Sequence, residues 1–246
     1  MRRLMALFGW FVGISAAEEP LRIVCWNIHH GAGMDGRIDL ERVAKVIAAE
    51  KPDLVALQEV DKSCTRSGMV DQCAELARLT GMTGHFGRAM DFGGGEYGHA
   101  ILSKHPVKSV RVHPLPGDGE PRIAFEAVVT WRGMDIRFAS THLDLDAERR
   151  LAQAKTLVGL LEKDTRPLVL CGDFNDVPGS PTIAAVSAVF SNMDKAPPAL
   201  TCPADRPTAE IDFVFLKGFR AVKPLVVLPE SVASDHRPLL AEVLRE

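Results

Sequence analysis

The sequence predicts an α+β fold, a four-layer α/β/β/α sandwich in which two packed, mostly antiparallel sheets lie between outer helices. Apolar residues recur with helical periodicity over residues 37–53 and again over about 147–163. Between residue 84 and about residue 140, short runs separated by Gly and Pro turns predict successive strands. Helices therefore flank a β-rich middle, and strands do not alternate strictly with helices as in a doubly wound nucleotide-binding fold.

Local signals divide the first part of the chain into elements. Residues 21–28 are an apolar run that predicts a strand with a polar end, and residues 53–60 predict a second buried strand. The helix between them has Asp39 placed to cap its start and Pro52 to end it. A short helix then closes on Gly81.

The rest of the chain continues the alternation of strands and turns up to the amphipathic helix near residue 147. After that helix, Ser180 and Pro181 are a cap followed by proline at the first helical position, which predicts another helix. The strands expected here are residues 84–90, 97–103, 106–112, 123–130, 134–141 and 166–170, followed by 210–216 and 237–244 as the last two.

The N-terminus has the pattern of a secretory signal peptide. Arg2 and Arg3 precede a short apolar run, and small residues follow up to Ala17. A first core helix or a membrane anchor is the alternative, but the run is shorter than the roughly 20 residues that a membrane span needs. We therefore expect residues 1–17 to be cleaved and residues 18–246 to form a single secreted or periplasmic domain.

Charge and composition restrict the partners. The formal net charge is −3, and the expected signal peptide removes two arginines and no acid, so the mature chain is more acidic still. No basic run remains that would attract a nucleic acid. We expect a monomer that acts on a phosphoester, without a stable nucleic-acid partner and without a transmembrane span in the mature chain.

The chain contains five cysteines. Cys25 and Cys171 lie in apolar, strand-like runs and are expected to be buried thiols. Cys64 and Cys73 flank a polar loop and could pair in an oxidising compartment, although spacing alone does not decide this. No spacing typical of a zinc site is present.

Polar residues that could bind a metal or carry a proton occur where buried strands are expected to end. A single one would indicate a turn, as the segment "CGDFND" does when taken alone. Six strand ends with the same chemistry instead indicate reacting groups held by a rigid scaffold. These residues are Asn27, Glu59, His142, Asp173, Asn175, Asp212, Asp235 and His236.

These residue types suit metal-assisted hydrolysis of a phosphoester. Oxygen ligands from Glu59, Asp235 and the carbonyl of Asn27 favour Mg²⁺ or Mn²⁺, with Ca²⁺ possible, over zinc. An ion held there would neutralise phosphate oxygens and stabilise charge on the leaving oxygen.

The other residues suit the movement of protons. Asp173 and Asn175 lie two apart, so on an extended backbone both would point the same way, one to orient water and one to hold a phosphoryl oxygen. His236 could act as general base, with Asp212 fixing its tautomer. His142 could donate a hydrogen bond to the phosphoryl oxygen.

In seven segments the sequence resembles the endonuclease/exonuclease/phosphatase superfamily of DNase I-like metal-dependent phosphoesterases. The segments are "NIHHG", "LQEVD", "YGHAILS", "STHLD", "GDFND", "IDFVF" and "SDHRPL", in the order found in the family. The resemblance implies the same sandwich fold. It also implies metal or phosphate binding by Asn27, Glu59 and Asp235, phosphate contact by His142, water handling by Asp173 and Asn175, and a base His236 supported by Asp212.

The chain departs from the family pattern at two positions. Glu210 stands where members often carry Arg, and His99 stands where many have Asn or another small residue. His99 could face the substrate, although a structural role is the alternative. Tyr97 and Arg122 are further weak candidates for substrate binding.

The sequence thus predicts a secreted phosphoester hydrolase that depends on a divalent metal, most simply a phosphodiesterase. The lack of a DNA-inserting wedge and the scarcity of aromatic stacking platforms favour a small-molecule or lipid-headgroup phosphoester. An extracellular nuclease of the same family is one alternative. A non-catalytic binding domain on the same fold is another, and the intact set of polar residues argues against it.

Overall fold

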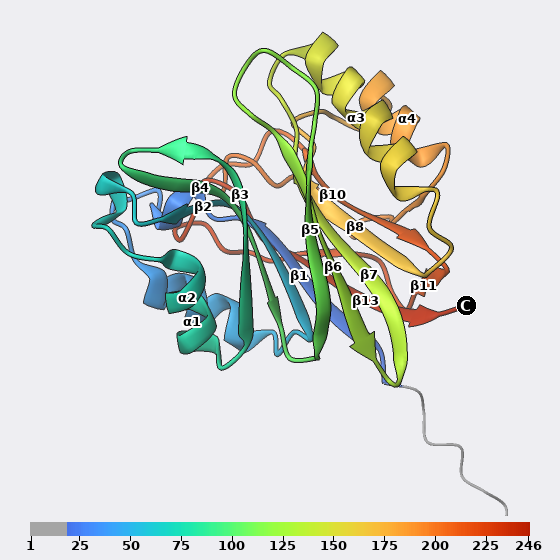
Figure 1. The fold of residues 1–246 in the computed structure, drawn as a ribbon, viewed down its shortest axis with the longest axis horizontal. Helices are drawn as coiled ribbons and strands as arrows, with labels where there is room; N and C mark the ends of the chain where they lie inside the picture. The colour runs from blue at the N-terminus through green and yellow to red at the C-terminus, as the bar shows by residue number, and fades with distance from the viewer. Residues whose placement is uncertain (1–18) are drawn as a thin grey trace, which may run out of the picture.

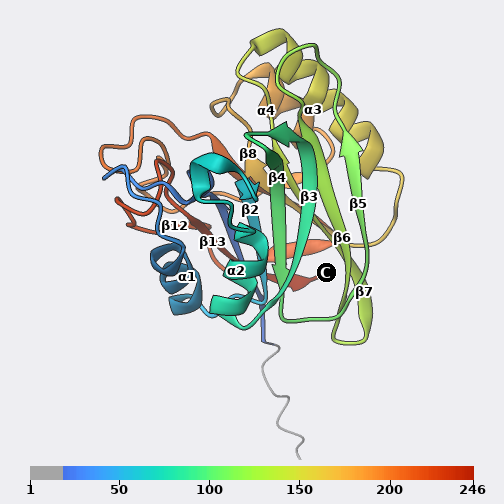
Figure 2. The same cartoon turned by 60° about the vertical axis from the view of Figure 1, so that its left-hand side comes forward.

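The computed structural model describes residues 19–246, so the expected signal peptide lies outside the described residues. Two sheets pack face to face, with helices on the outer side of each (Figure 1). The helices are α1 (Leu40–Ala49), α2 (Gln72–Thr80), α3 (Ala147–Leu161) and α4 (Pro181–Ser187). The pair α1 and α2 covers one sheet and the pair α3 and α4 the other (Figure 2). The predicted four-layer sandwich is confirmed.

The first sheet has seven strands in the order β11-β13-β1-β2-β4-β3, with β12 also paired to β13. Its strands are β1 (Leu21–Asn27), β2 (Leu54–Lys62), β3 (Thr83–Phe92), β4 (Gly95–Ser103), β11 (Phe219–Ala221), β12 (Val226–Val227) and β13 (Leu239–Arg245). Only the β1–β2 pair is parallel.

The second sheet has six strands in the order β5-β6-β7-β8-β10-β9. Its strands are β5 (Val107–Pro114), β6 (Ile123–Trp131), β7 (Met134–His142), β8 (Leu168–Asp173), β9 (Ser191–Asn192) and β10 (Asp212–Lys217). The β7–β8 pair is parallel. Both sheets are therefore mixed and mostly antiparallel, as predicted.

Helix ends follow the local signals in the sequence. Asp39 caps α1 by accepting a hydrogen bond from the backbone N–H of Arg42 at 2.9 Å. Gly81 ends α2 in the left-handed conformation, at φ 68°. Ser180 caps α4, with Pro181 at its first turn. The first helix is shorter than expected and stops at Ala49, before Pro52 is reached.

Apolar side chains form a core between the sheets and one under each helical layer. Phe125 and Phe138 lie between the sheets and are fully buried. Trp26 packs under the first helical layer, and Phe213 under the second. Because both faces of the central strands are covered, these strands are nearly continuous apolar runs, which explains why the sequence located them.

The strand directions bring the predicted polar residues to one end of the sandwich. Parallel pairing sets Asn27 opposite Gln58 and His142 opposite Asp173. Asp212 was expected to follow a strand, but it is the first residue of β10. Antiparallel pairing with β8 places it directly opposite Asp173. Because β13 is antiparallel to β1, the segment before β13 lies beside the end of β1.

The structure also bears on three other expectations. Residues 210–216 and 237–244 are not consecutive strands, because the short β11 and β12 lie between them. Cys64 and Cys73 are free thiols, and the sulfur of Cys64 lies 3.1 Å from the backbone carbonyl oxygen of Phe92. None of the helices in residues 19–246 has the length and apolar character needed to cross a bilayer.

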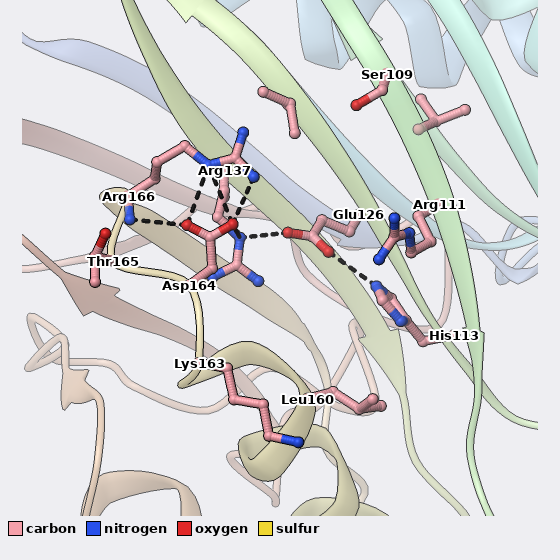
Figure 3. Close-up of a pocket in the computed structure, with 12 residues that line it drawn as sticks. Ser109, Arg111, His113, Glu126, Arg137, Leu160, Lys163, Asp164, Thr165 and Arg166 are labelled. Atoms are coloured by element: carbon pink, nitrogen blue, oxygen red, sulfur yellow. Dashed lines mark hydrogen bonds and ion pairs between the residues drawn. The ribbon is translucent and has the colours of Figure 1, made fainter.

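A network of charged side chains links the second sheet to the end of α3. Arg137 on β7 is buried and donates to Glu126 (Figure 3). It also donates to the carbonyl oxygen of Leu161 at 2.8 Å. Glu126 also pairs with His113 at 2.8 Å. The network lines a cavity of about 700 Å³ that contains none of the predicted site residues. It satisfies a helix-terminal carbonyl and serves the fold.

We predict that Glu126→Ala lowers the free energy of unfolding by about 3–5 kcal/mol, because it leaves the Arg137 charge buried without its main partner. The matched control is Lys108→Ala, which breaks the exposed pair with Asp135 at 2.8 Å and should change stability by about 1 kcal/mol or less. Urea unfolding measures both. Equal losses in the two variants would contradict the structural role of the network.

Candidate active site

The carboxylate of Asp173 is the centre of the cluster at this end of the sandwich. It is buried at the end of β8, with 1% of its surface exposed. Its Oδ2 atom lies 3.1 Å from Asn27 Nδ2, 3.5 Å from His142 Nε2 and 3.6 Å from His236 Nε2. Side chains from β1, β7, β8 and the segment before β13 therefore converge on one oxygen atom.

Asp212 and His236 form a buried pair beside this carboxylate. Asp212 Oδ2 lies 2.9 Å from His236 Nδ1, which leaves Nε2 to face Asp173. The Trp26 indole N–H donates to the His236 carbonyl oxygen at 2.8 Å. The Ser234 hydroxyl donates to the Asn27 carbonyl oxygen at 2.7 Å. These bonds hold the segment in place, and the contact with Asp212 keeps a proton on His236 Nδ1.

An extended backbone was expected to point Asp173 and Asn175 the same way. This expectation is wrong, because the backbone after Asp173 forms a turn. The N–H of Asn175 bonds Asp173 Oδ1 at 2.9 Å, which forms a tight Asx turn, and Asn175 has φ 50°. The Asn175 side chain donates to the carbonyl oxygen of Leu143 at 2.8 Å. Both residues still line the same cleft, because a turn rather than strand alternation brings them together.

Glu59 reaches the cleft from within β2 rather than from the end of a strand. The pairing of β2 with β4 is irregular between Leu57 and Val60, and Glu59 has φ 55°. Such a bulge re-aims one side chain out of the regular alternation. Asn27 Nδ2 then bonds Glu59 Oε1 at 2.9 Å. Asp235 lines the same cleft.

The cleft has a volume of about 350 Å³, and two of the three weak candidates for substrate binding line it. Tyr97 and Arg122 line it, and Arg122 is buried with its Nε atom unpaired among the described residues. His99 is not among the lining residues. Its Nδ1 lies 3.0 Å from the hydroxyl of Ser140, which also bonds Gln58 at 2.9 Å. This buried chain between the sheets fits the structural alternative for His99.

Sequence reasoning missed Arg66, which also lines the cleft. It lies in a polar loop with no distinguishing pattern, so no local signal could have identified it. Arg66 forms two hydrogen bonds to buried Asp61, at 2.8 and 2.7 Å. Its guanidinium lies over the Phe92 ring, 4.4 Å from the centroid, and 5.5 Å from that of Tyr97. Glu210, where the family often has Arg, pairs instead with Lys195 at 2.6 Å.

Burial and charge shift the proton affinities of the cluster. Burial raises the pKa of Asp173 to about 7, although His236 opposes the rise. Burial alone would lower the pKa of His236, but the charges of Asp212 and Asp173 outweigh it and hold that pKa well above 6.5. Burial, together with the Arg122 charge, holds the pKa of His142 well below its usual range. His142 is therefore neutral.

We predict that in the metal-free protein His236 titrates well above pH 6.5 and that Asp212→Asn lowers its pKa. Because this pKa is raised in the folded state, the ion pair contributes fully below the unfolded pKa of about 6.5, and its contribution is lost as the pH rises through the folded value. NMR titration of the imidazole measures the His236 pKa in the unaltered protein and in the variant, with His85 as the internal control. The same His236 pKa in both proteins would contradict the pairing.

Comparison with known proteins places this geometry in one family. The model of the endonuclease/exonuclease/phosphatase family matches residues 24–236. The protein YbhP of Escherichia coli (strain K12) is 26% identical over 247 residues, which cover 92% of this chain and 97% of that protein. All eight polar residues of the cluster lie inside the segment matched by the family model.

Solved structures share the fold along most of the chain. An endonuclease/exonuclease/phosphatase from Beutenbergia cavernae has a TM-score of 0.77 and 26% identity, covering 93% of this chain and 72% of that one. A mannosyl-6-phosphatase from Bacteroides thetaiotaomicron has a TM-score of 0.73 and 18% identity, covering 91% of this chain and 99% of that one, and shows the fold alone. The chain therefore belongs to the endonuclease/exonuclease/phosphatase family.

Proposed function

We propose that this protein is a divalent-metal-dependent phosphoester hydrolase and, more narrowly, a phosphodiesterase. One observation supports this proposal most strongly. Side-chain nitrogen atoms of Asn27, His142 and His236 all approach Asp173 Oδ2, and Asp173 lines an open cleft. A binding domain would have no need for a buried carboxylate with two histidines beside it, since such a carboxylate is costly to desolvate.

Oxygen donors in the cleft suit a hard divalent ion. Glu59 and Asp235 line it. Asn27 lies beside them, where its side-chain N–H donates to Glu59 and its side-chain oxygen accepts from the N–H of His29. We propose that these three residues hold Mg²⁺ or Mn²⁺, with Ca²⁺ as a further candidate. The ion, when bound, would supply charge neutralisation at the phosphate and at the leaving oxygen.

The other residues divide the remaining work. In our proposal the His236–Asp173 pair accepts the proton of the attacking water, and Asp212 keeps His236 oriented through its Nδ1. Neutral His142 donates an N–H to a phosphoryl oxygen, and Asn175 positions the group from the turn after β8. Buried Arg122 adds a positive charge at the cleft wall, and Tyr97 adds a hydroxyl.

A small-molecule or lipid-headgroup phosphoester fits the cleft best. The volume of about 350 Å³ suits a small group. Apolar side chains of Phe92 and Leu145 line it and are exposed by 38% and 75%. The net charge of −3 does not favour a long polyanion. We also propose that residues 1–17 direct secretion and that residues 18–246 form a monomeric domain.

We expect the mature chain to hydrolyse bis-p-nitrophenyl phosphate with Mg²⁺ or Mn²⁺ and not with EDTA. His236→Ala should lower turnover by about 100- to 10,000-fold, because it breaks the His236–Asp173 pair that accepts the proton of the attacking water. The control His85→Ala removes a half-buried histidine on β3 and should leave turnover within about twofold. Turnover that needs no metal would contradict the mechanism. A folded protein that binds metal but turns over no phosphoester would support a binding domain.

An extracellular nuclease remains the second candidate because the family includes nucleases. Cleavage of plasmid DNA should fall at least about tenfold between about 50 and 200 mM salt if backbone contacts bind the substrate. Hydrolysis of a phospholipid headgroup or of p-nitrophenyl phosphate should change little over that range. We expect the second pattern, and salt-sensitive DNA cleavage exceeding the other activities would assign the protein to the nucleases.

A further inference from the structure

Two consecutive histidines lie beside Glu59 and have no part in the mechanism above. They belong to the single turn η1 (His29–Gly31), which is separated from β1 only by Ile28. One ligand atom from each of His29, His30 and Glu59 lies within 4.8 Å of the other two. The two imidazole rings are 4.5 Å apart in an edge-on arrangement. Two nitrogen donors and one oxygen donor are thus close enough together to hold one ion.

The backbone at all three residues is in the left-handed region. The φ angles are 45° at His29, 44° at His30 and 55° at Glu59. This region is uncommon for residues other than glycine, and such strain persists only where surrounding contacts hold it. A simple turn needs fewer such residues and favours Gly, Asn or Asp for them. Three such residues grouped at three donor side chains indicate a requirement on where those side chains are placed.

Contacts from neighbouring elements hold this conformation. The buried side chain of Gln72 donates to the carbonyl oxygen of His30 at 2.7 Å. The N–H of His29 bonds the Asn27 side-chain oxygen at 3.1 Å. The bulge in β2 turns Glu59 toward the same place. Three separate elements fix the three donors in space.

One ring nitrogen of these two histidines is left over. His30 Nδ1 is buried and makes no hydrogen bond with any residue from 19 to 246. Buried polar atoms are rarely left unpaired in native proteins, and an unpaired one is often explained by a bound ion. A carboxylate oxygen of Asp235 also lies near, 4.0 Å from His29 Nδ1.

We propose that His29 and His30 complete, with Glu59, a site for a first-row transition ion of the kind that imidazole binds well, such as Zn²⁺ or Co²⁺. Imidazole nitrogen adds affinity for these ions and adds little for Mg²⁺ or Ca²⁺. The inference rests on the proposed function only through Glu59, which belongs to both donor sets. The histidines would thereby shift the metal preference of the cleft away from a purely oxygen-ligated ion.

Calorimetric titration of the metal-free mature chain with Zn²⁺, Co²⁺ and Mg²⁺ tests this site without using activity. The double variant His29→Gln/His30→Gln should weaken binding of Zn²⁺ and Co²⁺ by at least about tenfold and leave Mg²⁺ binding within about threefold. The visible spectrum of the Co²⁺ complex should change in the same variant, because nitrogen ligands are lost. Glu59→Gln should weaken all three ions.

His85→Gln is the matched control, since His85 also has a buried, unpaired ring nitrogen but lies on β3 outside the group. It should bind every ion as the unaltered chain does. Circular dichroism confirms that each variant is folded.

Unchanged Zn²⁺ and Co²⁺ binding in the double variant would overturn the proposal. An equal loss for all three ions would also overturn it, because the histidines would then only shape Glu59. Failure of phosphoester hydrolysis would count against the proposed function alone, since these titrations do not depend on turnover.

Discussion

The candidate site depends on one buried carboxylate, that of Asp173, and on the donors that surround it. A carboxylate with 1% of its surface exposed is costly unless neighbouring groups bond to it. Asn27 supplies a side-chain N–H and Asn175 a backbone N–H. The strand that carries Asp173 also lies very close to β7. A Cβ atom at Gly172 would lie 1.9 Å from the carbonyl oxygen of Thr141, so only glycine fits before the aspartate.

Four of the eight described non-glycine residues with positive φ lie in or beside the same cleft. Glu59 and Asn175, which line it, have φ angles of 55° and 50°, and the neighbouring His29 and His30 have 45° and 44°. Each of these conformations costs free energy that the packed sandwich offsets. The rigid sheets thus hold several side chains in positions that regular strands could not provide. The expected consequence is a site whose donors are placed before any ligand arrives.

Much of the fold could be predicted because its signals are local. Helix caps at Asp39 and Ser180 and the stop at Gly81 depend on a few neighbouring residues. The long buried strands are visible as apolar runs. Strands β9, β11 and β12 contain two or three residues each. They carry no periodic pattern, and they form only because a longer strand lies beside them to pair with.

The sequence by itself determined a set of eight candidate polar residues, since these interrupt apolar runs in a recognisable order. Only the tertiary structure decided how they meet. Antiparallel pairing sets Asp212 opposite Asp173, a bulge turns Glu59 inward, and a loop brings Arg66 to the cleft. The reason is physical: side-chain type and local propensity are properties of short segments, whereas strand register and bulges follow from packing between segments far apart in the chain.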